Sequence, residues 1–229
     1  MKEKDYPISP LNRDELKRRL GNSFPSVYLT VMGIIQAVAL GILIDNFHYQ
    51  ISNESKLIEQ FLISGRSVIS FMMITLVLFE YNYFVWVNKW MPDFWDTLIP
   101  LALGASEIAP MYFLDDLFWW WPLNSILAAV GGLAFLNTRR RCEQWMFEDE
   151  EGNEGSKAYD LVMVGNDKNI RTSIYTFMLC WSCPILISNN LLVYKWEFAF
   201  IIVYLIAILY TFFRENIFLK KLTETYFGK

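Results

Sequence analysis

Long apolar segments alternate with short polar segments along the chain, and this pattern predicts helices that span a membrane. Residues 27–44, 117–138 and 172–194 contain no Asp, Glu, Lys or Arg. A membrane-spanning helix needs roughly 20 mostly apolar residues, because each residue rises about 1.5 Å through a hydrocarbon layer about 30 Å thick. The three segments meet this requirement, or nearly meet it, without an internal charge.

Three further segments follow the same pattern with flaws. Residues 67–88 contain Glu80, residues 95–114 contain two acids of which Glu107 is the inner one, and residues 198–213 are uncharged but short. Hydrophobic residues make up 54% of the chain and charged residues 19%, against about 45–50% and about 25% in ordinary soluble domains. A soluble protein of this length would have too little polar surface left after burying all six segments. We therefore predict an all-α, polytopic integral membrane helical bundle with about six transmembrane helices.

The uneven distribution of Lys and Arg predicts the orientation of this bundle. With six spans, 17 of the 20 Lys and Arg fall on the side that holds both termini, and only Lys56, Arg66 and Lys195 fall on the other side. Short cytoplasmic loops carry an excess of basic residues. Both termini are therefore expected in the cytoplasm, with the protein in the plasma membrane (the inner membrane of a bacterium). On the opposite side, apolar residues at helical spacing within residues 49–65 favour a short amphipathic surface helix.

The predicted spans divide the chain into five parts. Residues 1–25 are expected to form a cytoplasmic segment with an interfacial helix, and residues 26–138 contain transmembrane helices one to four. Residues 139–171 form an acidic cytoplasmic loop, residues 172–214 contain the last two transmembrane helices, and residues 215–229 form a cytoplasmic helical tail.

Glu107 is the first candidate for a pore or coupling residue. An acid at the centre of a span costs roughly 2.5–3.5 kcal/mol, so such groups tend to face a protein interior or a wet cavity. Pro100, Gly104 and Glu107 are spaced by three and four residues and share one stripe of the helix. Pro100 frees a backbone carbonyl and Gly104 permits close approach of another helix. These features also suit a structural kink in which Glu107 only hydrogen-bonds a neighbour.

Glu80 and Asn82 are further pore or coupling candidates in the second predicted span. Their spacing of two residues directs them to different faces of a helix, so they cannot both line one narrow path. Gly33 and Gly41, two turns apart in the first predicted span, provide a small-residue face that can pack within the chain or between subunits.

Cys180 and Cys183 form a Cys-x-x-Cys pair in the fifth predicted span. Such a pair can carry redox or metal chemistry, but buried cysteines also behave as small apolar residues. Packing is the favoured interpretation, because Ser173 and Thr176 continue the same mildly polar stripe. The sequence has one histidine and contains no metal-binding, nucleotide-binding or nucleophile motif. We therefore expect no enzymatic activity, no cofactor and no direct contact with nucleic acid.

The acidic loop at residues 139–171 is the largest predicted soluble element. About thirty residues cannot bury a core of their own, so the loop either is solvated or docks onto a partner protein, onto the tail or onto another copy of the chain. Its candidate docking residues are Glu148, Asp149, Glu150 and Glu151.

Three functions agree with these features. The leading hypothesis is a channel-like or pore-forming protein that acts as a homo-oligomer in the lipid bilayer, with Glu107 and Glu80 facing the pore. The alternative is a non-conducting membrane scaffold or sensor that recruits a cytoplasmic protein partner in a multi-component system, such as a defence system, through residues 139–171 and the tail. The second alternative is a proton-coupled carrier of a small solute.

Overall fold

The computed structural model describes residues 13–87, 94–145, 153–189 and 196–227, and within these ranges every regular element is a helix. Six α-helices and one 3₁₀ helix follow one another along the chain. They are α1 (Arg13–Asn53), α2 (Leu57–Val87), α3 (Phe94–Ile108), η1 (Ala109–Phe113), α4 (Leu117–Trp145), α5 (Asn153–Ser188) and α6 (Glu197–Phe227). The all-helical prediction is confirmed for the part of the chain that is described.

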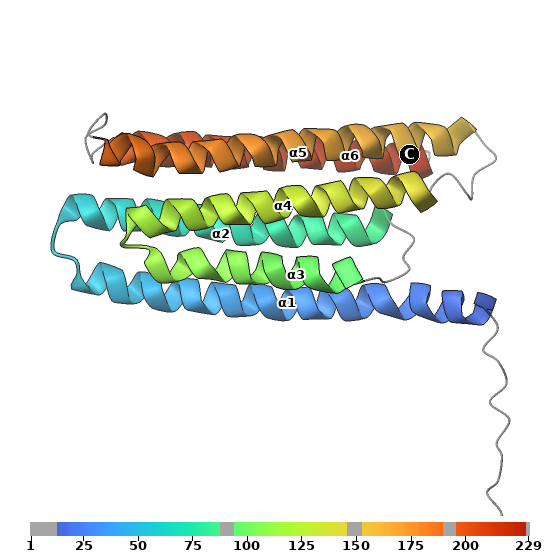
Figure 1. Cartoon of the computed structure of the whole chain (residues 1–229), viewed down its shortest axis with the longest axis horizontal. Helices are drawn as coiled ribbons and strands as arrows, with labels where there is room; N and C mark the ends of the chain where they lie inside the picture. The colour runs from blue at the N-terminus through green and yellow to red at the C-terminus, as the bar shows by residue number, and fades with distance from the viewer. Residues whose placement is uncertain (1–12, 88–93, 146–152, 190–195, 228–229) are drawn as a thin grey trace, which may run out of the picture.

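The helices lie side by side as one elongated bundle and run alternately in opposite directions (Figure 1). The contacts pair α4 with α5, α1 with α2, and α6 with both α2 and α5, while α3 fits between α1 and α4. The bundle has a terminal end, where α1 begins and α6 ends, and an opposite far end, where α4 and α6 begin (Figure 1). These two names are used below for the two ends.

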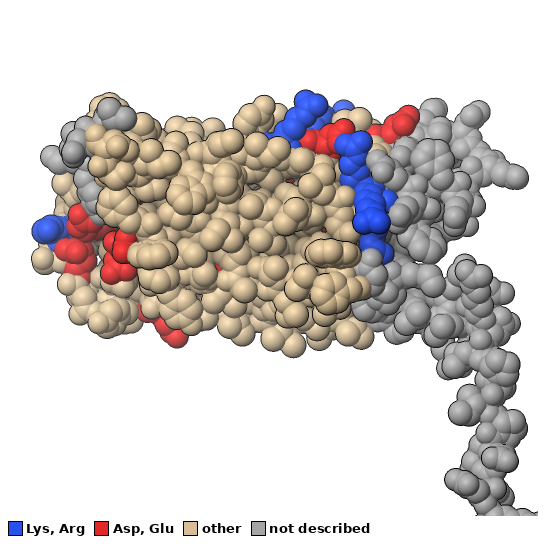
Figure 2. All heavy atoms as spheres, in the orientation of Figure 1, with Lys and Arg blue, Asp and Glu red and all other residues tan. Residues whose placement is uncertain are grey.

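Five helices are long and apolar enough to cross a membrane, namely α1, α2, α4, α5 and α6. Their outward faces carry large apolar side chains, and Ile34 and Ile206, for example, are 60% and 61% exposed. A soluble protein would not leave so much apolar surface in water. Charged side chains gather at the two ends of the bundle, on either side of a broad uncharged band (Figure 2). The chain therefore has the architecture of a multi-pass membrane protein.

The segment from α3 to η1 is the shortest of the apolar elements, with its apolar part at Thr97–Phe113. Pro110 lies at the start of η1, where its missing N–H costs no helical hydrogen bond. The 3₁₀ helix rises about 2.0 Å per residue against about 1.5 Å in an α-helix, so α3 and η1 together extend about 32 Å. The next helix begins directly afterwards, because the Asp116 carboxylate accepts a hydrogen bond of 2.9 Å from the Phe118 N–H and caps α4.

Several helices run further than the apolar pattern alone indicated. The first continues without a break from Arg13, and the second begins at Leu57, so the surface helix expected within residues 49–65 is instead the end of α1 and the first turns of α2. Much of residues 139–171 is also helical, since α4 reaches Trp145 and α5 begins at Asn153. The last helix also runs into the tail, since α6 ends at Phe227.

Candidate functional site

A buried ion pair lies near the far end of the bundle. Arg66 of α2 donates from Nε and Nη2 to the two carboxylate oxygens of Glu197 at the start of α6, over 2.8 and 2.6 Å, and both side chains are fully buried. Arg66 Nη1 donates to the Leu114 carbonyl over 2.7 Å, and Trp121 Nε1 donates to Glu197 over 3.0 Å. These four residues, called the clamp below, tie α2, α4 and α6 to the end of η1.

The clamp was not predicted from the sequence. Arg66 was placed at a loop because the apolar run begins at residue 67, yet α2 starts at Leu57 and carries Arg66 inside the bundle. A signal was present, since Arg66 and Glu197 are opposite charges directly before two predicted spans and a buried charge must be paired. Lys195, two residues before Glu197, is an equally near basic residue in the sequence, so the sequence alone does not select Arg66 as the partner.

Glu107 is fully buried inside a single chain and faces α1. Its Oε2 accepts a hydrogen bond of 2.8 Å from Gln36 Nε2. Among the described residues, Glu107 Oε1 and Gln36 Oε1 have no hydrogen-bond partner. Gln36 was also missed from the sequence, although it is the sole amide in the charge-free segment 27–44. Glu107 therefore has a hydrogen-bond partner, Gln36, within its own chain.

The stripe predicted from the sequence runs through Thr97, Pro100, Gly104, Glu107 and Met111, and it is buried only in part. Pro100, Gly104 and Glu107 of α3 and Met111 of η1 are buried, whereas Thr97 is exposed. A Cβ added at Gly104 would lie only 2.6 Å from the side chain of Ile35. The glycine therefore permits the close approach of α3 and α1 that brings Glu107 to its partner.

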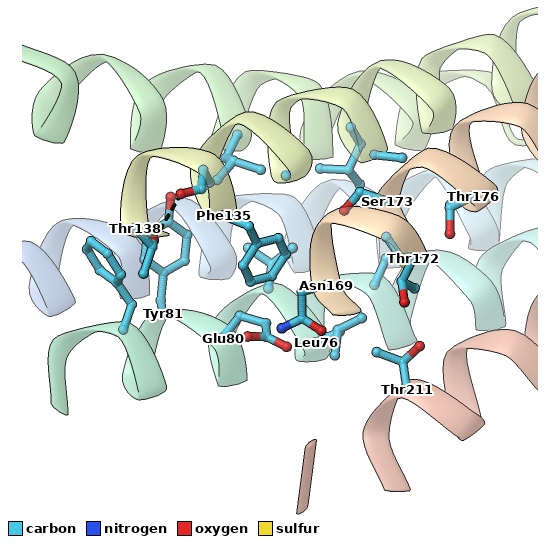
Figure 3. Close-up of a pocket in the computed structure, with 18 of the residues that line it drawn as sticks. Leu76, Glu80, Tyr81, Phe135, Thr138, Asn169, Thr172, Ser173, Thr176 and Thr211 are labelled. Atoms are coloured by element: carbon cyan, nitrogen blue, oxygen red, sulfur yellow. Dashed lines mark hydrogen bonds between the residues drawn. The ribbon is translucent and has the colours of Figure 1, made fainter. Parts of the chain in front are cut away.

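A cavity of about 140 Å³ lies between the helices, and all six α-helices contribute to its lining. One water needs about 10–15 Å³ by this measure, so the cavity can hold a small solute. Along α4 the lining runs from Leu127 to Thr138, which corresponds to about 16 Å of helix. The cavity extends from the middle of the bundle toward the terminal end, where Glu80, Phe135 and Asn169 point into it from three different helices (Figure 3).

Among the lining helices, α5 contributes the largest share of the polar residues. Its polar lining residues there are Asn169, Thr172, Ser173 and Thr176. A Cβ added at Gly132 of α4 would lie 3.3 Å from the Cβ of Ser173, so α4 and α5 pack closely beside the cavity. The polar stripe predicted for the fifth span is therefore partly a cavity wall.

Glu80 and Arg214 are the two charged groups in this lining, and their surroundings differ. The Arg214 guanidinium donates to Glu215 over 2.9 and 2.6 Å, to Thr172 over 2.8 Å, and to Asn169 Oδ1. Glu80 Oε2, in contrast, is buried without a hydrogen-bond partner among the described residues. Glu215 and Arg214 act on Glu80 only through space, with opposite signs. The cavity therefore presents one carboxylate that can take a further partner.

The remaining candidates lie apart from the cavity lining. Asn82 is exposed and donates to the Leu78 carbonyl of its own helix, so it does point away from Glu80. Cys180 and Cys183 are fully buried free thiols, and Cys180 is hydrogen-bonded to Tyr204. Within the described residues, no three His, Cys, Asp or Glu side chains are grouped as a metal would require.

Two predictions about surfaces have different outcomes. Glu148, Asp149, Glu150 and Glu151 lie outside the described residues, and their docking role stays a prediction. Gly33 and Gly41 lie on an exposed face of α1, and a Cβ added at either position would meet no atom within 4 Å. This small-residue face is therefore not used for packing by the described part of the same chain.

Fold and site together define a multi-pass helical membrane protein with a buried ion pair near one end and a solute-sized cavity toward the other. Comparisons of the chain with protein-family models, with curated proteins and with solved structures gave no match.

Proposed function

We propose that the chain is a proton-coupled carrier of a small solute, with its binding site in the cavity beside Glu80. The observation that carries this proposal is the cavity itself, into which Glu80 presents a carboxylate oxygen that has no hydrogen-bond partner among the described residues. Intramembrane acids of this kind are costly and are typical of substrate paths and proton relays. A proton and a solute can compete for the same oxygen, which is the basis of coupling.

A carrier accounts for the geometry better than an open pore does. A pore needs a continuous polar path, but the part of the bundle beyond the cavity is filled by large buried side chains such as Trp120 and Trp121, and by the clamp. A cavity that such packing closes on one side fits one state of an alternating-access cycle. Glu107, hydrogen-bonded to Gln36 within the chain, contributes in this proposal to helix packing.

The topology is part of the same proposal. The combined length of α3 and η1, about 32 Å, matches a hydrocarbon layer of about 30 Å, which favours six spans over five. Six spans, with 17 of the 20 Lys and Arg on the side of the termini, favour cytoplasmic termini in the plasma membrane. A reporter enzyme fused after Asp116 and one fused after Phe227 are then expected on opposite sides of the membrane.

The homo-oligomeric channel is the second candidate, and the exposed face of α1 with Gly33 and Gly41 favours it. Small residues let helices approach closely in lipid, so this face can pack against a second copy. The two candidates differ in what moves. A channel conducts ions passively through the assembly, whereas a carrier moves protons only when its solute is present.

Proton flux in proteoliposomes tests the carrier. The purified chain is reconstituted with a pH-sensitive dye inside, and separate solutes are added outside: amines, carboxylates, sugars and amino acids. One solute class is expected to drive proton movement in the wild type and not in Glu80→Gln. The control Glu224→Gln removes an exposed acid of α6 outside the cavity lining and is expected to behave as the wild type. If no solute class moves protons, or if Glu80→Gln leaves the movement intact, the carrier is wrong.

A further inference from the structure

We infer that the cavity binds a monovalent organic cation, with the Glu80 carboxylate as counter-ion and aromatic rings as the remaining contacts. This inference rests on the proposed function, because it assigns a substrate class to the same cavity. Three features of the lining carry it: the sign of the available charge, the kind of surface around it, and the oxygens that surround Glu80.

The first feature is the sign of the charge. Every nitrogen of the Arg214 guanidinium already donates to an acceptor on Glu215, Thr172 or Asn169. The Glu215 carboxylate also neutralises this guanidinium, at 2.6 Å, so an anionic solute would find one remaining N–H of Nη1 beside a charge that is already paired. Glu80 Oε2 has no such partner among the described residues, so a solute that brings a positive charge gains an attraction at no loss of an existing bond.

The second feature is the surface of the cavity. Aromatic rings contribute from five of the lining helices: Tyr28, Tyr81, Phe84, Trp95, Phe135 and Tyr204. The faces of such rings attract ammonium groups, by about 0.5–1 kcal/mol at exposed sites and about 2 kcal/mol or more when water is excluded. The same rings favour the apolar part of a solute. Aromatic walls around one acid are therefore suited to a cation with an apolar body.

The third feature separates an organic cation from a metal ion. Divalent ions need about six or more oxygen ligands, and the described residues contain no group of three metal-binding side chains. An organic ammonium ion needs no coordination shell, so one carboxylate suffices for it.

Calorimetric titration of the full chain in phosphatidylcholine nanodiscs tests this inference. The probe is benzyltrimethylammonium, whose charge does not depend on pH, and benzyl alcohol and phenylacetate provide an aromatic neutral molecule and an aromatic anion. The cation is expected to bind at least about tenfold more tightly than either, after subtraction of the heat from empty nanodiscs. Equal binding of all three, or binding of phenylacetate alone, would overturn the inference. This comparison uses the wild type, so it does not depend on the folding of any variant.

Variants then locate the site. Glu80→Gln is expected to reduce the affinity for benzyltrimethylammonium at least about tenfold, while Glu80→Asp keeps the charge and retains most of it. The matched control Glu224→Gln should bind as the wild type. Unchanged affinity in Glu80→Gln would overturn the assignment.

Failure of this inference and failure of the carrier are distinguishable. If another solute class drives proton movement and benzyltrimethylammonium does not bind, the carrier stands and the substrate class is wrong. If benzyltrimethylammonium binds at Glu80 and no solute moves protons, the cavity is a cation site of a protein that is not a carrier.

Discussion

The clamp at the far end gives the sharpest test of what stabilises the bundle. Replacing Arg66 by Met removes three hydrogen bonds of 2.6–2.8 Å and leaves the fully buried Glu197 carboxylate with the Trp121 N–H as its described donor. Removing one partner of a buried ion pair typically costs about 3–5 kcal/mol, because the other charge stays desolvated. Arg66→Met is therefore expected to lower the free energy of unfolding by about that amount.

The double variant tests whether Arg66 and Glu197 stabilise the bundle as a pair or independently of each other. Glu197→Gln alone leaves an unneutralised guanidinium, whereas Arg66→Met with Glu197→Gln leaves no buried charge. The double variant should therefore be less destabilised than the sum of the two single variants, by about 2 kcal/mol or more. Unfolding in mixed micelles of dodecyl maltoside and sodium dodecyl sulfate, followed by circular dichroism, gives the three free energies.

An exposed ion pair of the same chain is the matched control. Arg139 of α4 and Asp167 of α5 form a salt bridge whose side chains are 39% and 44% exposed. Such pairs contribute about 0–1 kcal/mol, so Asp167→Asn should have little effect. An ordinary hydrogen bond between membrane helices is worth about 0.6 kcal/mol. If Arg66→Met costs no more than that, or if the two single effects simply add, the clamp does not hold the helices as argued here.

Two further predictions concern α3 and its contact with α1. Gly104→Ala should destabilise the bundle by about 1–3 kcal/mol, because the new Cβ would lie 2.6 Å from the Ile35 side chain. Gly33→Ala is the control: its new Cβ would have no atom within 4 Å, so it should be neutral or slightly stabilising in the same unfolding assay. Equal effects at the two glycines would contradict the close approach of α3 and α1. Glu107→Gln should change stability by less than about 1 kcal/mol, since an amide still accepts from Gln36 Nε2 and can donate to its unpartnered oxygen. Glu107→Leu should cost about 1–3 kcal/mol by leaving the buried amide unpaired, and a reversed order of these two variants would show that the hydrogen bond is not what Glu107 provides.

The helices were predictable because lipid imposes a strong pattern on the sequence. Charge-free stretches such as 117–138 have few alternatives to a membrane helix, and α4 lies where that pattern indicated. The boundaries were less predictable. An apolar count stops at a charge, so it ended a span at Arg66, whereas the helix continues through that residue because Glu197 neutralises it.

The acids within the spans were predictable from the sequence, but their partners were not. An acid within a span is informative by itself, which is why the sequence indicates Glu107 and Glu80 as candidates; their role in a pore or in coupling stays a prediction. Their surroundings depend on packing between distant segments. Gln36 lies 71 residues before Glu107, and Glu80 and Asn169 line the same cavity because α2 and α5 both border it. A single sequence contains no signal for those distances.

Because of the clamp, separating the helices costs more free energy at the far end of the bundle than at the terminal end. Near the far end, separating α2 from α6 breaks the Arg66–Glu197 ion pair, whose two charged groups are both buried away from water. Toward the terminal end the helices instead enclose a cavity. If the chain works as the proposed carrier, opening at the Arg66–Glu197 pair is expected to be the slower of the two openings, because water or another ion must replace one of the two charges.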